Sequence, residues 1–187
     1  MLKRVVLSVA TLTLAAFVLI GCGGPPKELI EKATVAMKKA TEAKADVYAK
    51  EAFDAANAAL NKGAEAVKKS DWDGAKKAYT EAAAQFEAAA KAAPEAMKAK
   101  MEEAKAGIAA AKKAWEDMGK DKMLMAATKL MKKDDKAKYD AMGKEVEGAV
   151  KGAEGMMETD PMGALSSLAM ATEKMDAMKK MAMPAKK

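Results

Sequence analysis

The sequence contains no histidine and a single cysteine, Cys22, among its 187 residues. The lack of histidine removes the commonest general base and the commonest metal-ligating side chain together. With one cysteine, no disulfide can form within the chain. The sequence also has no Gly-rich phosphate loop, no nucleophile motif of the G-x-S-x-G kind and no carboxylate pair in apolar surroundings. We therefore expect a protein that is not an enzyme and that holds no cofactor.

Arginine and aromatic residues are scarce as well. Arg4 is the only arginine, and aromatic residues make up 4% of the chain. The remaining cations are lysines interleaved with Asp and Glu, whereas nucleic-acid-binding proteins usually cluster their cations and use Arg for bidentate contacts. We expect no nucleic-acid partner. The hydrophobic fraction of 51% comes largely from Ala and Met, and Ala buries little area, so the core should be thin.

The N-terminus has the layout of a secretory signal. Lys3 and Arg4 precede an uncharged run over residues 5–20, which is marginal in length for a membrane-spanning helix. The run ends in Leu19-Ile20-Gly21-Cys22, which resembles the lipobox of bacterial lipoproteins. The resemblance implies cleavage between Gly21 and Cys22, diacylglyceryl transfer to the Cys22 thiol and acylation of the new amine, for example by palmitate. Residues 1–21 are then a signal peptide, and residues 22–26 form the lipidated Cys and a short tether.

The same resemblance implies a location in the cell envelope, with the chain held to a membrane by its lipid. Two or three acyl chains exceed what stable anchoring needs. Gly23 follows the cysteine where, in enteric bacteria, an Asp would indicate retention at the inner membrane. In a Gram-negative host we therefore expect the periplasmic face of the outer membrane.

The rest of the chain is predicted to be all-α, with long antiparallel helical hairpins that form an extended bundle or a coiled-coil-like array. No segment after residue 26 alternates with a period of two, and prolines are few. Apolar and small residues instead recur at alternating three- and four-residue steps, the spacing of helices packed side by side. The first seam is Phe53, Ala56, Leu60, Gly63 and Val67; the second is Trp72, Ala75, Tyr79, Ala82, Phe86, Ala89 and Ala93; the third is Met97, Met101, Ala104, Ile108, Ala111, Trp115 and Met118.

Helix ends are predicted from caps and breakers. A first helix can run from about Lys27 to Lys69, and Asp71 can cap the next one. Pro94 leaves two alternatives open, namely one kinked helix or two abutting helices. Gly119 can end a helix, and Asp121 can cap the helix that follows. Asp160 can cap a further helix, with Pro161 at its first position.

The second half of the chain resembles the first after a shift of 89 residues. Residues 62–65 then fall on residues 151–154, Asp71 falls on Asp160, and the second seam falls on a further set of small and apolar residues. That set is Pro161, Ala164, Leu168, Ala171, Met175, Met178 and Ala182. We read this as an internal duplication, with coincidence in an Ala- and Lys-rich composition as the alternative.

Residues 47–93, with their Ala-rich helix, their turn at residues 70–73 and their returning helix, resemble an uncharacterised family of alanine-rich helical-hairpin domains. Such domains occur mainly in bacterial lipoproteins and secreted proteins, and the resemblance brings no catalytic residues with it. We divide the chain into an Ala-rich hairpin over residues 27–93 and a second, Met-rich helical region over residues 94–187.

Methionine is concentrated in that second region: of 17 Met residues, only Met1 and Met37 precede residue 97. Thioethers are soft ligands that suit Cu(I) or Ag(I), but Met also fills irregular cores. The candidate metal ligands are Met175, Met178, Met181 and Met183. Met175 and Met178 lie on the face of Leu165 and Leu168, which favours the core interpretation. An adaptable hydrophobic contact surface is a further alternative.

Two remaining features concern charged residues. The mixed charges of residues 132–136 indicate a solvated helix surface, with binding of an anionic polymer or of lipid headgroups as the alternative. Lys187 ends the chain, and a C-terminal lysine joins the murein lipoprotein of enteric bacteria to peptidoglycan. A terminal lysine is also unremarkable in a Lys-rich protein.

These features predict a non-enzymatic envelope lipoprotein that acts as a structural or protein-interaction module. Its expected partners are the membrane, through the lipid anchor, and an envelope protein or the cell wall; a homo-oligomer stays open. The alternatives are a Met-based Cu(I)/Ag(I)-binding periplasmic protein and a peptidoglycan tether through Lys187.

Overall fold

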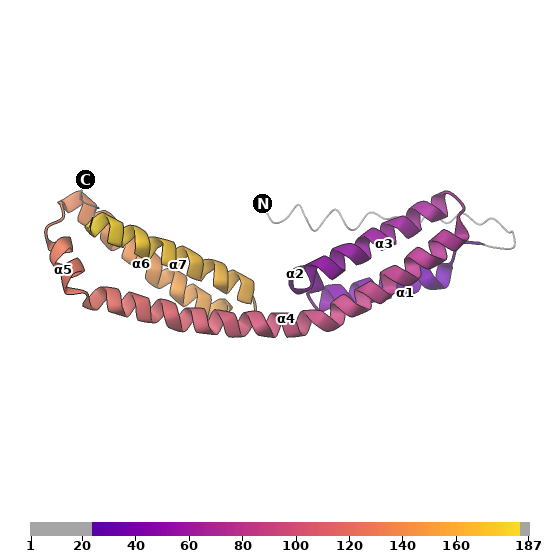
Figure 1. Cartoon of the computed structure of the whole chain (residues 1–187), viewed down its shortest axis with the longest axis horizontal. Helices are drawn as coiled ribbons and strands as arrows, with labels where there is room; N and C mark the ends of the chain where they lie inside the picture. Colours follow the sequence, from indigo (N-terminus) through magenta and orange to yellow (C-terminus); the bar gives the residue numbers. More distant parts are fainter. Residues whose placement is uncertain (1–23, 184–187) are drawn as a thin grey trace. The chain divides into compact units, whose positions relative to one another are not determined.

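The computed structural model describes residues 24–183, and within that range it consists of helices and turns (Figure 1). No strand occurs in this part of the chain, so the all-α prediction is confirmed. Gly21, Cys22 and Lys187 lie outside the described residues. The helices are α1 (Lys27–Glu42), α2 (Ala45–Tyr48), α3 (Lys50–Lys68), α4 (Trp72–Lys120), α5 (Lys122–Lys129), α6 (Lys133–Met156) and α7 (Pro161–Ala182).

The chain divides into two compact units. Of the described residues, the first unit holds those up to Lys39 together with Glu51–Ala88, and the second holds Ala40–Lys50 together with those from Ala89 onward. Helix α4 contributes to both. The division therefore falls within α4, between Ala88 and Ala89.

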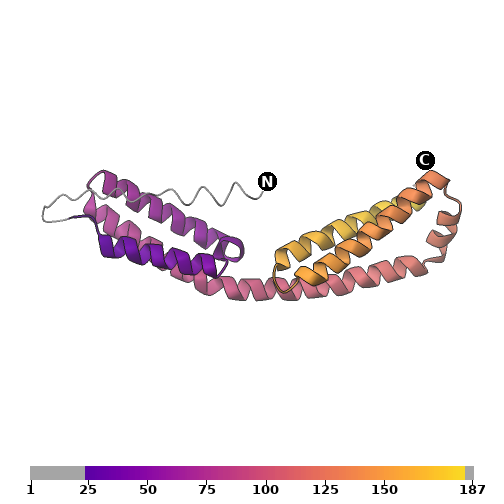
Figure 2. The ribbon, with the colours of Figure 1, turned by 180° about the vertical axis from the view of Figure 1, so that it is seen from behind.

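The prediction of a single helix from about Lys27 to Lys69 was wrong, because the chain reverses direction between α1 and α3 (Figures 1 and 2). The reversal contains neither Gly nor Pro. Instead Lys44 takes the left-handed conformation, with φ 57°, and its backbone N–H donates to the Thr41 carbonyl at 2.9 Å. A non-Gly residue pays roughly 1–2 kcal/mol for that conformation. The reversal lets both arms of the hairpin bury their alanines.

Two contacts within the second unit stabilise this reversal. The Lys44 ammonium donates to the Thr159 carbonyl at 3.0 Å, in the turn between α6 and α7. Tyr48 lies close enough to Asp160 for the carboxylate to raise the pKa of its hydroxyl, after a larger effect of burial, while a hydrogen bond with the Met162 backbone opposes the shift. These partners are more than 100 residues away in sequence, so no local pattern could indicate the break.

The core of the first unit is built from small residues around a few rings. Phe53 of α3 and Phe86 of α4 meet edge to face, with ring centroids 5.4 Å apart and planes at 70°. Tyr79 packs on α3 where Gly63 has no side chain. The buried residues around these rings are mostly alanines, namely Ala33, Ala36, Ala56, Ala59, Ala75, Ala78, Ala82 and Ala83.

The second unit packs α6 and α7 beside the later part of α4 (Figures 1 and 2). Its core is richer in large side chains: Ile108, Met118, Leu124, Val146, Val150, Leu168, Met175 and Met178. Ion pairs link the helices on the outside, Lys112 with Glu154 and Lys174 with Glu145, the latter at 2.5 Å. Such exposed pairs contribute little stability, so the apolar seam holds the unit together.

Helix α4 continues through Pro94, so of the two alternatives left open there the single helix is the one observed. The second and third seams lie on it, and most of their members are buried. At its end, Asp121 caps α5 by accepting hydrogen bonds from the backbone N–H groups of Met123 and Leu124, at 2.8 and 3.1 Å. The caps predicted at Asp121 and at Asp160, which precedes Pro161 and α7, are both confirmed.

The turns that join α3 to α4 and α6 to α7 share one capping arrangement. Asp71 accepts from the Gly74 N–H at 2.9 Å, and Asp160 accepts from the Gly163 N–H at 3.0 Å. In both turns the carboxylate lies over the glycine, because a Cβ there would be 2.2 Å from the carboxylate oxygen. A Cβ at the third helical position of either returning helix would therefore displace the capping carboxylate.

The buried faces also correspond, with one difference in register. In α7 the buried positions follow those of α4 at the expected shift of 89 residues. In α6 the buried Gly143, Val146, Val150 and Ala153 follow the first seam at a shift of 90 residues. The identical residues at 62–65 and 151–154 match at a shift of 89 instead, so they do not occupy equivalent buried positions. The duplication itself stays a prediction.

Candidate functional site

The N-terminal connection is short and leads directly into the first unit. Pro25 and Pro26 are half-buried, and α1 begins at Lys27. The Lys27 N–H donates to the Pro25 carbonyl at 2.8 Å, and the N–H groups of Leu29 and Ile30 both donate to the Pro26 carbonyl at 3.0 Å. The Pro26 carbonyl is thus the first acceptor of the helical hydrogen bonds, and α1 follows the two prolines directly.

The structure separates the four candidate methionines by environment. Met175 and Met178 are 3% and 1% exposed, within the core of the second unit. Met178 lies against α6, because a Cβ on Gly143 would be 3.6 Å from its methyl carbon. Met181 is half-buried and Met183 is 43% exposed. A soft metal held by all four would require Met175 and Met178 to leave their packing.

Other ligand types do not gather either. Among the described residues, no group of three or more His, Cys, Asp and Glu side chains is placed to hold a metal ion.

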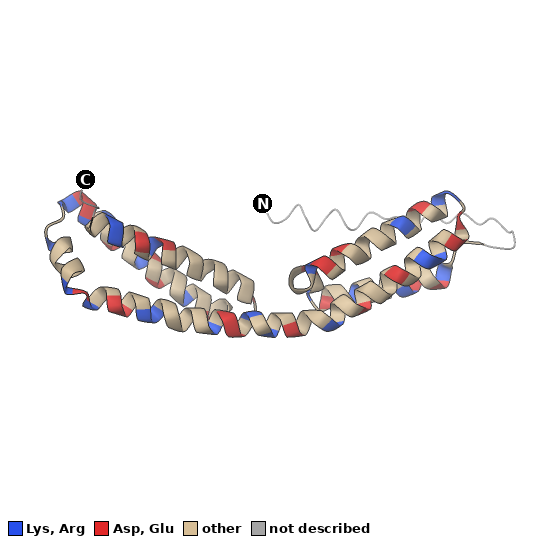
Figure 3. Ribbon diagram, in the orientation of Figure 1, with Lys and Arg blue, Asp and Glu red and all other residues tan. Residues whose placement is uncertain are grey.

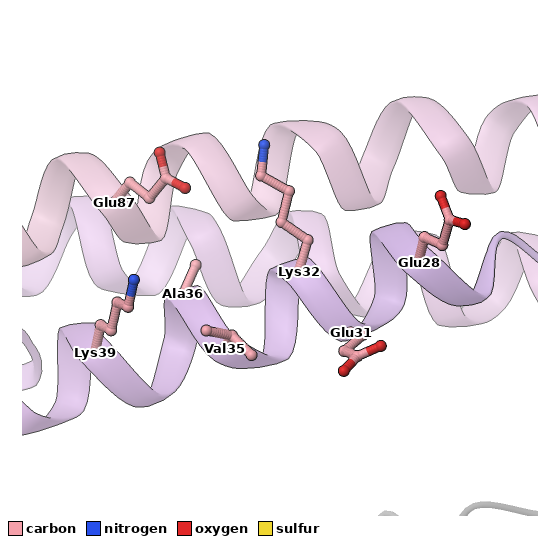
Figure 4. Close-up of a pocket in the computed structure, with 7 residues that line it drawn as sticks. All are labelled: Glu28, Glu31, Lys32, Val35, Ala36, Lys39 and Glu87. Atoms are coloured by element: carbon pink, nitrogen blue, oxygen red, sulfur yellow. The ribbon is translucent and has the colours of Figure 1, made fainter.

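A groove of the first unit runs between α1 and α4 and measures about 370 Å³ (Figure 4). Its apolar floor is Val35 and Ala36, and its rim carries charges of both signs on exposed side chains. Figure 4 shows the Lys32 side chain extending toward α4 while Glu31 points away from it. The lining residues are Glu28, Glu31, Lys32, Val35, Ala36, Lys39 and Glu87. This mixed, solvated rim offers a surface for contact and no enclosed chamber for a reaction.

A second groove of about 320 Å³ lies between α4 and α6, beside the half-buried ring of Trp115. Lys112 and Glu154 form an ion pair across it. Trp115 also contacts the backbone of α6, since a Cβ on Gly143 would be 3.2 Å from the ring. The ring is thus part of the packing, and what remains of the groove is shallow and charged.

The most unusual surface surrounds α5, and sequence reasoning missed it. Leu124 is 2% exposed and attaches α5 to the core, whereas Met123, Met125 and Leu130 are 72%, 44% and 87% exposed. Isolated exposed apolar residues are ordinary, but three within eight positions are a patch. The available signal was the Met123-Leu124-Met125 run itself, since a helix of eight residues can bury only one face of it.

The pKa values of two further tyrosines are also raised. Burial raises the pKa of Tyr79, and both burial and the neighbouring Asp140 raise the pKa of Tyr139. Each ring packs into a helix seam, so these shifts reflect packing. Neither group faces one of the grooves.

No helix in residues 24–183 is long and apolar enough to cross a bilayer. No family model, curated protein sequence or solved structure is significantly similar to the chain.

Proposed function

We propose that this protein is a non-enzymatic, lipid-anchored lipoprotein of the cell envelope that acts as a structural or protein-interaction module. The observation that carries the proposal is the position of Leu19-Ile20-Gly21-Cys22, at the end of an uncharged run and only five residues before α1 begins. A lipobox works only at the end of such a run, and a folded domain follows it immediately.

The short tether has a mechanical consequence. Five residues span at most about 17 Å when fully extended. Lipid on Cys22 would therefore keep the start of α1 beside the bilayer. The hydrogen bonds from Lys27, Leu29 and Ile30 to the two prolines restrict the orientation of α1 relative to residues 25 and 26. The protein would be presented at a fixed height above the membrane, as a structural or docking module needs.

The surface of the folded units supports the interaction role. Their grooves are shallow and edged by Lys and Glu, and several large apolar side chains stay exposed on α1, α5 and α7. Wide, mixed surfaces of this kind suit contact with another macromolecule better than capture of a small molecule.

The test compares the full precursor with its Cys22→Ser variant in a bacterial host. The native chain should incorporate labelled palmitate, partition into the detergent phase and stay with membranes after a high-salt wash. Cys22→Ser should not incorporate the label and should keep residues 1–21, while the control Gly24→Ala should be labelled and cleaved, because a Cβ on Gly24 meets nothing within 4 Å. Labelling of Cys22→Ser at the level of the native chain, or an unlabelled native chain, would overturn the anchor.

A further inference from the structure

One end of the second unit combines exposed apolar side chains with a local excess of positive charge. We call residues 120–133 the α5 end; they comprise the last residue of α4, α5, the turn that follows it and the first residue of α6. Met123, Met125 and Leu130 project from it, and Leu124 holds it on the core. The apolar side chains are therefore presented on a supported helix.

The charge of the α5 end differs from that of the rest of the chain. It contains five lysines, Lys120, Lys122, Lys129, Lys132 and Lys133, against the single acid Asp121. Without Lys3 and Arg4, the formal net charge of the protein falls from +6 to +4. The α5 end alone carries +4, so the remainder of residues 22–187 is balanced.

The nearby acids do not cancel this excess. Asp121 faces the N-terminus of α5, where its carboxylate accepts two backbone hydrogen bonds. Glu116 pairs with Lys120, which leaves four lysines in the α5 end. Asp134 and Asp135 follow in the first turn of α6, where they complement the helix dipole. Lys136 pairs with Asp140 at 3.4 Å, and Lys138 comes next.

The C-terminal end of α7 adds to the same end of the unit. Helices α6 and α7 are antiparallel neighbours, so α7 finishes where α6 begins, close to α5 (Figures 1 and 2). It brings Lys180, the exposed Met183, and Lys179, which pairs with Asp176 at 3.8 Å. Figure 3 shows blue lysine segments around α5 and at the start of α6.

We propose that the α5 end is a membrane-contact element that inserts Met123, Met125 and Leu130 into the headgroup region of an anionic bilayer. Apolar side chains surrounded by lysines fit that boundary, because the apolar groups leave water while the long lysine stems keep their ammonium groups at the phosphates. Anionic lipids attract such clusters, and salt screens the attraction. A second copy of the chain is a poor occupant, since two α5 ends would repel each other.

This contact does not depend on lipidation of Cys22. It is reversible and salt-sensitive, whereas a lipid anchor is neither. The two attachments can therefore be measured separately. The protein for the test is residues 22–187 with Cys22→Ser, which lacks the anchor and contains no cysteine.

The primary measurement is cosedimentation of that protein with vesicles of phosphatidylethanolamine and phosphatidylglycerol, and with vesicles of phosphatidylcholine alone. Binding is expected to the first, to decrease as salt is added, and to be weak on the second. The charge variant Lys122→Gln, Lys129→Gln, Lys132→Gln, Lys133→Gln should bind at least about 100-fold more weakly, since each lysine near an anionic surface contributes about fivefold. A matched control, Lys62→Gln, Lys91→Gln, Lys105→Gln, Lys144→Gln, has the same net charge and should bind far better than the charge variant.

Insertion is tested by the apolar side chains. Met123→Gln, Met125→Gln, Leu130→Gln should lose most of the binding, while the control Val35→Gln, Met162→Gln, Met170→Gln alters other exposed apolar residues elsewhere and should keep it. A polarity-sensitive dye on Met123→Cys should shift to the blue when anionic vesicles are added, and the same dye on Met170→Cys should not. Circular dichroism must show that every variant stays helical.

Several outcomes would overturn the proposal. They are an absence of vesicle binding, equal binding to both vesicle types, equal loss in the two lysine variants, and a dye at position 123 that stays in water. Binding of the α5 end to a soluble acidic protein while vesicles are ignored would assign this surface to a protein partner instead.

Discussion

The ring of Tyr79 lies directly on the backbone of Gly63, so that a Cβ at position 63 would be 2.9 Å from two of its ring carbons. This contact lets α3 approach α4 closely. Small residues at seam positions thus leave room for the few large rings of the core.

Gly63→Ala should consequently destabilise the first unit. The Tyr79 ring is rigid, so it must move away from an added methyl group. Overpacking of this kind destabilises the fold by about 1–3 kcal/mol, which exceeds the stability gained from the higher helix propensity of Ala. Chemical denaturation gives the free energy of unfolding. Gly148→Ala and Gly155→Ala are the controls: nothing lies within 4 Å of their added Cβ, so they should gain about 0.5–1 kcal/mol. Gly63→Ala combined with Tyr79→Leu should recover part of the loss.

The shared capping arrangement predicts matched effects in the two hairpin turns. Asp71→Ala and Asp160→Ala should each cost about 0.5–2 kcal/mol, because each removes the acceptor for a backbone N–H in the first turn of a helix. Asp73→Ala is a suitable comparison, since its carboxylate forms only an exposed pair with Lys76 and should matter little. A negligible effect at both caps, measured by thermal unfolding, would contradict the arrangement.

The core methionines should behave as packing residues. Met175→Ala with Met178→Ala should lower stability by about 2 kcal/mol or more per site, whereas Met181→Ala with Met183→Ala should cost little near the chain end. Leu at positions 175 and 178 should be tolerated because its volume is close to that of Met.

Cu(I) titration against a competing chelator separates packing from metal binding. If the methionines are packing residues, the native protein and the Leu variant should both leave the metal with the chelator. Tight stoichiometric binding that disappears in the Leu variant, while the fold persists, would establish a soft-metal site.

Stability should fall in alkaline solution, in part through Tyr79. Burial raises the pKa of its hydroxyl, so between the ordinary tyrosine pKa of about 10 and the raised value the folded state binds more protons than the unfolded state. The free energy of unfolding is then unaffected by Tyr79 below the ordinary value and decreases above it. Tyr79→Phe should show a shallower alkaline decrease, and an unchanged slope would argue against this burial effect.

The sequence was informative wherever spacing alone decides the structure. The regular steps of the second and third seams fix which face of α4 is buried, and the step from Ala93 to Met97 keeps that face continuous across Pro94. Loss of one hydrogen bond at a proline is tolerated in a helix that packs on both sides of it. Asp121 and Asp160 were recognisable because a cap is a local interaction.

The missed features depend on distant parts of the chain. The reversal at Lys44 has no breaker residue, and it is stabilised by Thr159 and Asp160, which lie far along the sequence. The exposure of Met123, Met125 and Leu130 follows from the shortness of α5, which composition does not reveal. Met-rich segments suggested a core or metal ligands, and only the fold distinguishes Met178, which is buried, from Met123, which is not.

The most direct test of the account is the mass of the N-terminal tryptic peptide from protein extracted from membranes. Cleavage after Gly21 and after Lys27 gives a peptide of residues 22–27. If Cys22 is the lipid anchor, this peptide should carry a diacylglyceryl group on the Cys22 sulfur and a fatty acyl chain on its amine. An unmodified Cys22, or a chain that still begins with residues 1–21, would contradict it.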